Sequence, residues 1–335
     1  MKQTTFRKMI LDALKEKVQS SSILLPSKID FTQKNADTIE LKLNPDAVGF
    51  GSKPINMQMN DAAFEGWALA LHVHLGYKIY MDIPKQPRNN HSLGHYHRFL
   101  YRVHKFSSQF KDWFICGIEL QKQVDDYQCH LNDSSLVFTN NIPTGEAGNN
   151  GNLENLVEEL MSTPTEDNLL CSIVTTAGLH LSPSQIYRQL PVGLFLSTPS
   201  KENSEFTGGK SAIDLWSPTG DGIAIFELKS NNKMLGIITE LMFYANYMFD
   251  MYVDKSISRR PTFMPNTTET RYRGYFHLLK TYSNIHAFFL TDILHPLITA
   301  DVIAEMNRGA CGISYGNLHY DLRIVVNELE VVTSK

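Results

Sequence analysis

Residues 212–229, AIDLWSPTGDGIAIFELK, decide the fold that we expect for this chain. Two runs rich in β-branched and aromatic residues flank the turn formers of residues 217–222, which predicts two antiparallel strands joined as a hairpin. Side chains alternate between the faces of a strand, so Glu227 and Lys229 point the same way. With the turn near the middle of 217–222, Asp214 becomes a diagonal neighbour of Glu227, at about 7–8 Å. The hairpin therefore predicts two carboxylates with an ammonium group beside them.

Such a group has the composition of a magnesium site. Mg²⁺ keeps several waters and takes one or two carboxylates together with phosphate oxygens, and Mn²⁺ can replace it. A lysine beside the ion can orient an attacking water and offset charge on a phosphorus-centred transition state. The alternative is a solvated hairpin with a surface Glu and Lys, the usual interpretation of an isolated E-x-K. The apolar run around Glu227 argues against it, because buried charges are costly unless they are paired or used.

The chain around the hairpin predicts a sheet flanked by helices, and hence an α/β fold. The expected helices are 153–161, 166–175, 235–252 and 299–307; the expected strands are 186–196, 212–216, 222–228 and 285–290, with closing strands over 318–332.

Residues 140–152 are rich in turn formers and divide the chain. We expect an N-terminal α/β module over 1–145, of unknown type with a DNA-binding or regulatory role, and a second domain over 153–335. In the first module the expected helices are 4–18, 60–76 and 94–111, and the expected strands are 38–43, 77–83 and 113–120.

Over about residues 160–300 the chain resembles the PD-(D/E)xK nucleases, whose restriction-endonuclease-like core is a mixed sheet flanked by helices. The resemblance implies that Asp214 and Glu227 bind Mg²⁺, with the Leu228 carbonyl as a further ligand, and that Lys229 lies beside the attacking water. It also implies an acid on the helix before the strands, and Glu166 corresponds to it. Ile213 stands where the family usually has proline.

Two residues of the helix after the hairpin, Glu240 and Tyr244, stand one turn apart and can face the site. Ordinary helix surface and core is the equal alternative for both. If Glu166 proves to be in solvent, Glu65 in the first module becomes the next acid to consider.

Two basic groups are candidates for nucleic-acid contacts. Arg98, Arg102 and Lys105 recur at helical spacing, which predicts a basic stripe that can bind phosphates, with a solvated surface face as the alternative. Arg271 and Arg273, with two further arginines, bracket a loop after the proposed site helix and can clamp a nucleic-acid backbone.

Two other patterns are set aside. Asp37 with the E-x-K of residues 40–42 leaves no room for a hairpin between acid and glutamate. His91, His95 and His97 resemble a metal cluster, but no carboxylate stands at a matching spacing, and His95 and His97 point apart on a helix.

Composition limits the remaining classes of protein. The 335 residues carry 31 Lys and Arg against 35 Asp and Glu, and the net charge of −4 argues against a globally basic nucleic-acid binder. The four cysteines show no C-x-x-C pair, which indicates a reducing, cytoplasmic setting. No stretch has the length and apolarity of a membrane span, and we expect no membrane partner. Walker, dinucleotide-binding, serine-hydrolase and zinc-protease motifs are absent.

We therefore expect a Mg²⁺-dependent nuclease that hydrolyses phosphodiester bonds, in DNA before RNA, in bacterial defence or DNA processing. A homodimer is expected if both strands are cut, because each strand needs its own site. The alternative is a catalytically inactive nucleic-acid-binding or assembly module with the same fold.

Overall fold

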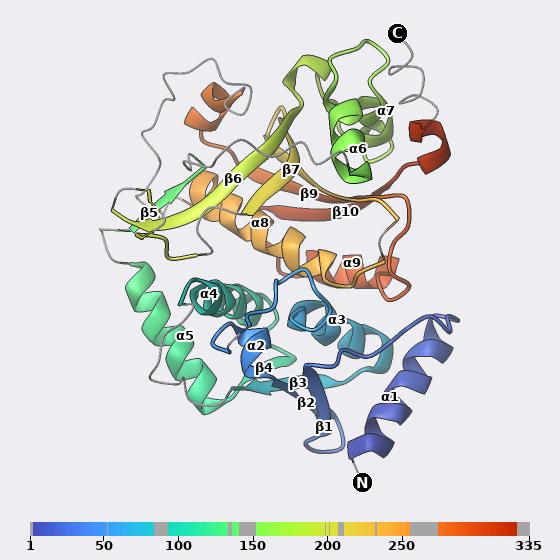
Figure 1. Ribbon diagram of the computed structural model, residues 1–335, viewed down its shortest axis with the longest axis vertical. Helices are drawn as coiled ribbons and strands as arrows, with labels where there is room; N and C mark the ends of the chain where they lie inside the picture. Colours follow the sequence, from blue (N-terminus) through green and yellow to red (C-terminus); the bar gives the residue numbers. More distant parts are fainter. Residues whose placement is uncertain are drawn as a thin grey trace.

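Two mixed β-sheets, with helices between them and on their outer sides, make up the described chain (Figure 1). The computed structural model describes residues 3–51, 53–83, 93–132, 136–140, 152–197, 199–200, 202–206, 211–231, 233–254 and 274–326. The α/β class expected from the sequence is confirmed at this coarse level.

The larger sheet contains the hairpin. Its strands lie in the order β10-β9-β8-β7-β6-β5; the pairs from β5 to β8 are antiparallel, and β8, β9 and β10 are parallel. Its strands are β5 (Leu136–Thr139), β6 (Tyr187–Leu196), β7 (Ser211–Pro218), β8 (Gly222–Lys229), β9 (Asn284–Thr291) and β10 (Ile313–His319). The helices of this half are α6 (Leu153–Ser162), α7 (Leu169–Thr175), η1 (Pro183–Gln185), α8 (Ile237–Tyr252), η3 (Tyr275–Leu279) and α9 (Ala300–Asn307).

The two faces of this sheet are covered by different helices, and the sequence of β8 shows why. Alternate residues point to opposite faces of a strand. Phe226 and Leu228 pack with α6 and α7, whereas Ile223 and Ile225 pack into the core that includes α8. Because both faces are covered, β8 is buried along its whole length.

The smaller sheet lies in the first half of the chain, in the order β1-β2-β3-β4, with β1 antiparallel to β2 and the other pairs parallel. Its strands are β1 (Ile29–Gln33), β2 (Thr38–Leu43), β3 (Lys78–Asp82) and β4 (Phe114–Cys116). The helices of this half are α1 (Gln3–Lys17), α2 (Pro45–Val48), α3 (Phe64–Leu75), α4 (Leu93–Gln109) and α5 (Ile118–Leu131).

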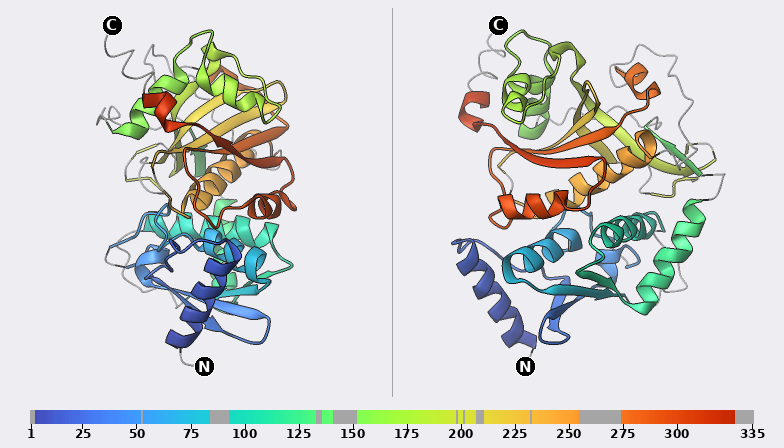
Figure 2. Two further views of the ribbon diagram at one scale, coloured as in Figure 1. Left: turned by 90° about the vertical axis from the view of Figure 1, so that its right-hand side faces the viewer. Right: turned by 180° about the vertical axis from the view of Figure 1, so that it is seen from behind.

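Helices α3, α4, α8 and α9 lie between the two sheets (Figures 1 and 2). Helix α3 packs against α8 and α9, while α8 packs against β8 and β9. Helix α4 also meets α8, since the Tyr101 hydroxyl donates a 2.7 Å hydrogen bond to Asp250. The helices of the first half thus pack directly on the helices of the second.

The two expected domains share one hydrophobic core. A single cluster of buried side chains extends from α1 to β10 and includes residues of both sheets. Strand β5 precedes the expected division of the chain, yet it pairs with β6. The Tyr247 hydroxyl fastens this pair, because it accepts from the Thr139 N–H at 2.9 Å and lies 2.7 Å from the Gly193 carbonyl oxygen. Most of the expected linker, residues 141–151, lies outside the described residues.

Two expected strands differ from the structure. Strand β4 ends at Cys116 instead of Leu120, because helix α5 begins at Ile118 after the extended Gly117. The Asp82 carboxylate accepts the Leu120 N–H at 3.0 Å and so satisfies a free donor of the first turn.

The region of the expected closing strands, residues 318–332, also differs: its strand begins earlier and gives way to a helix. Strand β10 pairs with β9 from Ile313 to His319, and residues 322–326 are helical. The remainder of the expected closing strands, from residue 327, lies outside the described residues.

Candidate active site

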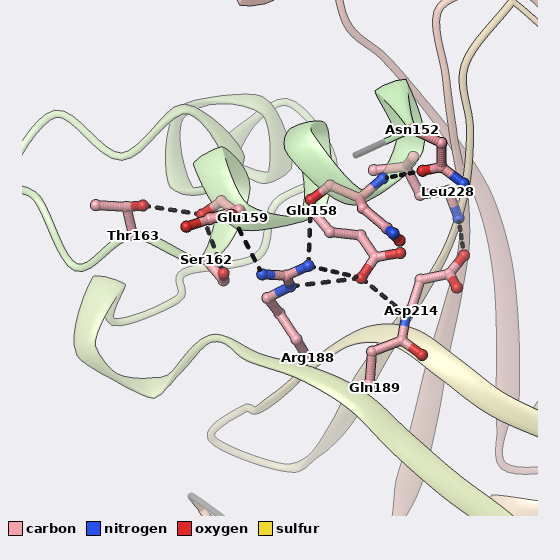
Figure 3. A network of polar contacts seen from close by, with 10 residues as sticks. Asn152, Glu158, Glu159, Ser162, Thr163, Arg188, Gln189, Asp214 and Leu228 are labelled. Atoms are coloured by element: carbon pink, nitrogen blue, oxygen red, sulfur yellow. Dashed lines mark hydrogen bonds and ion pairs between the residues drawn. The ribbon is translucent and has the colours of Figure 1, made fainter. Parts of the chain in front are cut away.

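The β7–β8 hairpin brings Asp214 and Glu227 together. In its register Leu215 lies opposite Phe226, and Asp214 and Glu227 are the next residues of the two strands. The Asp214 Oδ2 accepts the Leu228 N–H at 2.8 Å (Figure 3). The charge of Asp214 raises the pKa of Glu227, so the two acids lie near each other at this end of the hairpin.

Lys229 lies among carboxylates from the sheet and from α8. Its Nζ is 2.8 Å from Glu227 Oε1 and 3.4 Å from Glu240 Oε2, and it donates to the Leu228 carbonyl at 3.1 Å. Glu227, Lys229 and Glu240 are 2%, 8% and 5% exposed. Glu240 thus joins the group from the helix, as one of the two sequence interpretations expected.

The pKa values show that the carboxylates crowd one another. Burial raises the pKa of Asp214 to about 7, against the attraction of Lys229. Burial also raises the pKa of Glu227 well above its usual value, and the charges of Asp214 and Glu240 add to this. Burial alone lowers the pKa of Lys229, but the surrounding carboxylates, Glu227 first, outweigh it and hold this pKa well above its usual value.

Negative charge exceeds positive charge in this group. Asp214, Glu227 and Glu240 surround one ammonium group, so full ionisation leaves two uncompensated negative charges. The Glu227 Oε2 is buried and has no hydrogen-bond partner among the described residues. A buried carboxylate oxygen of this kind is costly unless it binds a proton or a cation.

Helix α6 contributes an acidic residue that sequence reasoning missed. Glu158 is buried beside the hairpin and accepts a 2.8 Å hydrogen bond from Gln189, and Arg188 pairs with it at 3.4 Å (Figure 3). Its charge raises the pKa of Asp214, which shows that the two acids are near each other. Glu158 lies next to the buried Val157 in α6. The helical spacing of the apolar residues could therefore have indicated that this acid faces the protein interior.

Glu166, the acid expected from the resemblance, lies elsewhere. It is exposed in the turn between α6 and α7. Helix α7 begins only at Leu169, because Asn168 caps it by accepting the Cys171 N–H at 3.0 Å. The helix expected from residue 166 is therefore shorter, and Glu166 precedes it as a solvated charge.

The prediction that the basic residues of α4 form a phosphate-binding surface is wrong. Arg98 and Arg102 are 4% and 5% exposed, because α4 packs against α8. Arg102 forms a bidentate ion pair with Glu65, in which two guanidinium nitrogens donate to the two carboxylate oxygens at 2.7 and 2.6 Å. Lys105 pairs with Asp250. The Lys105 pair joins the two halves of the molecule, whereas the Arg102 pair joins α4 to α3 within the first half.

The Arg98 side chain also makes its contacts inside the protein. Its NH1 donates to the Ser211 hydroxyl at 3.2 Å, and its guanidinium lies over the Phe243 ring. Burial lowers its pKa to about 10. Glu65, the reserve acid of the sequence analysis, is the partner of Arg102 rather than a member of the Asp214 group. Arg271 and Arg273 lie outside the described residues.

The two patterns that the sequence analysis set aside have other partners. His97 Nδ1 lies 2.8 Å from Glu205, which His130 also contacts, and His91 lies outside the described residues. Lys42 forms an exposed pair with Glu40 at 3.2 Å on β2.

The oxygen atoms of the hairpin fit a hard divalent cation. Asp214, Glu227 and the Leu228 carbonyl offer three oxygen ligands, and Glu227 Oε2 lacks another described partner. Mg²⁺ needs no more protein ligands, since waters and phosphate oxygens complete its shell. Within the described ranges no group of three or more His, Cys, Asp or Glu side chains is arranged to hold a metal ion by itself.

No helix in the described part of the chain combines the length and apolarity that crossing a bilayer requires. Comparisons with protein-family models, with curated proteins and with solved structures find no match to the chain. The function must therefore be argued from the residues of the hairpin and of the helices beside it.

Proposed function

We propose that this protein is a Mg²⁺-dependent nuclease that hydrolyses phosphodiester bonds, with DNA as its substrate. One observation carries the proposal: the half-buried Asp214 and the buried Glu227 lie on adjacent strands beside Lys229, with an excess of negative charge and a carboxylate oxygen that has no described protein partner. A divalent cation and an anionic substrate together suit such a group better than either one alone.

The order of elements around the site supports the same proposal. Helices α6 and α7 are followed by the antiparallel strands β6, β7 and β8, then by α8 and by β9, which is parallel to β8. This is the helix, three-strand, helix, strand order that the resemblance to PD-(D/E)xK nucleases led us to expect. A restriction-endonuclease-like core is accordingly part of the proposal.

Each side chain would have a separate role. Asp214, Glu227 and the Leu228 carbonyl would hold Mg²⁺, which polarises phosphate oxygens and favours hydroxide over water when bound. Lys229 stays protonated because carboxylates surround it, so it would act as a charge beside the phosphate and as a donor to the attacking water. Glu240 would keep the ammonium in place from the helix side.

Nucleic acid as partner rests on this chemistry alone, because the described α4 residues are used inside the protein. A homodimer and a cytoplasmic location remain part of the proposal for the reasons given from the sequence. The rival is a binding or assembly module in which Lys229 serves only to neutralise Glu227 and Glu240.

A digestion assay on plasmid, linear single-stranded DNA and RNA, with Mg²⁺, Mn²⁺ or a chelator, tests the proposal. Wild-type protein should cut only with metal, and Lys229→Ala should abolish cleavage. Lys42→Ala is the matched control, since Lys42 belongs to the other E-x-K and lies exposed on β2. Cleavage that survives in Lys229→Ala, or wild-type protein that neither cuts nor binds Mn²⁺, would favour the binding module.

A further inference from the structure

A loop of the first half of the chain contacts the beginning of α8. The Asn60 Oδ1 accepts the N–H groups of Leu235 and Gly236 at 2.9 and 3.3 Å, directly before the helix. A Cβ at Gly236 would lie 1.8 Å from the Gln58 carbonyl oxygen, so only glycine allows this approach. The start of α8 is thus fitted to residues 58–60.

The same loop reaches the charged group through the Gln58 side chain. Its amide lies 2.8 and 3.2 Å from the two carboxylate oxygens of Glu240. Carboxylate oxygens accept hydrogen bonds, so the amide presents its nitrogen to them. Glu240 therefore has Gln58 on one side and the Lys229 ammonium on the other.

A second contact holds the same turn of α8. Thr239, the residue before Glu240, donates a 2.8 Å hydrogen bond to Glu65, and Arg102 fixes Glu65 from α4. All three of these side chains are buried. The first turn of α8 is therefore held by two polar contacts from the first half, one at Glu240 itself and one beside it.

We propose that Gln58 is a positioning residue that completes the candidate active site from the other half of the chain. The inference rests on the proposed function for its catalytic meaning. By holding the Glu240 carboxylate, Gln58 keeps Lys229 between Glu240 and Glu227 and leaves the remaining oxygens of Asp214 and Glu227 for the cation. The first half of the chain is then a structural part of the site and not a separate nucleic-acid-binding module.

A double-mutant cycle on the metal-free protein tests this contact. Gln58→Met keeps the length of the side chain but removes its donor, and Glu240→Gln removes the charge that it holds. The readout is the rate at which acetic anhydride modifies Lys229, measured by mass spectrometry. Each single variant should raise this rate about tenfold, the factor that corresponds to losing one hydrogen bond to a charged group. The double variant should react no faster than Glu240→Gln alone.

Gln33→Met, an exposed glutamine at the end of β1, is the matched control and should leave the rate unchanged. Two results would overturn the inference. One is an unchanged rate of Lys229 modification in Gln58→Met; the other is a double variant whose rate increase equals the product of the two single increases. A general loosening of the fold would give multiplied effects, because it does not depend on the charge of Glu240. If the cycle behaves as expected while wild-type protein binds no Mn²⁺, the positioning role stands and the proposed nuclease function fails.

Discussion

Replacing Asp214 by Asn should change how the stability of the protein depends on pH. The carboxyl group has a pKa of about 7 in the folded protein against an ordinary value of 3.8, because it is buried. A group with a raised folded pKa stabilises the protein fully below its unfolded pKa, and this contribution is lost as the pH rises through the folded pKa. The asparagine side chain of the variant would keep an oxygen for the Leu228 N–H but would not titrate.

The size of the effect follows from the two pKa values. Each pH unit between them is worth about 1.4 kcal/mol, so the whole interval is worth about 4 kcal/mol. Without divalent cations, the unfolding free energy of Asp214→Asn should therefore rise relative to wild type by up to about 4 kcal/mol between pH 4 and pH 8. At the upper pH, Mg²⁺ at a hundredfold excess over its Kd should restore about 2.7 kcal/mol to wild type and nothing to the variant.

Urea denaturation followed by tryptophan fluorescence, at several pH values with chelator or with Mg²⁺, measures both effects. Asp221→Asn is the control, because Asp221 lies on the same hairpin but its pKa is lowered by the hydrogen bond from His286. Because both the folded and the unfolded pKa of Asp221 lie below about 4, the difference between that variant and wild type should stay nearly constant from pH 4 to pH 8. A constant difference between Asp214→Asn and wild type from pH 4 to pH 8 would refute the account of a half-buried carboxyl group crowded by other acids.

Three further outcomes are expected. Lys229→Ala should abolish metal-dependent cleavage and leave the circular dichroism spectrum unchanged; cleavage at the wild-type rate would exclude Lys229 from the chemistry. Arg102→Ala should lower the unfolding free energy by about 3–5 kcal/mol, because it leaves Glu65 buried without its partner; denaturant midpoints measure this, and a loss below about 1 kcal/mol, on the scale of an exposed pair, would contradict it. Glu158→Gln should slow cleavage or weaken Mn²⁺ binding measured by calorimetry, whereas Glu166→Gln should change neither, since only Glu158 lies near Asp214.

The hairpin could be predicted because its information is local. The alternation along β8 and the turn formers before it determine which side chains share a face, and Glu227 and Lys229 do contact each other. The register of the two strands was harder to predict, since it depends on the residue at which the turn closes.

The role of the α4 arginines could not be read from the helix alone. A stripe such as Arg98 and Arg102 looks the same in sequence whether it faces water or a second helix. The partner that buries it, α8, comes about 140 residues later, and the ion pair of Arg102 depends on the position of Glu65. Glu158 was missed for a similar reason, because only the packing of α6 on the sheet shows that this acid is buried.

Because strand β5 pairs with β6, the chain cannot be divided at residues 140–152 without disrupting the larger sheet. A gene fragment that begins after residue 152 would encode the whole charged group but would lack Leu136–Thr139, the strand that pairs with the edge of β6. The Tyr247 hydroxyl would then lose its contacts with Thr139 inside the protein. Recombination or subcloning at the apparent domain boundary would therefore separate a sheet from its own last strand. The smallest unit that evolution could move intact includes residues on both sides of that boundary.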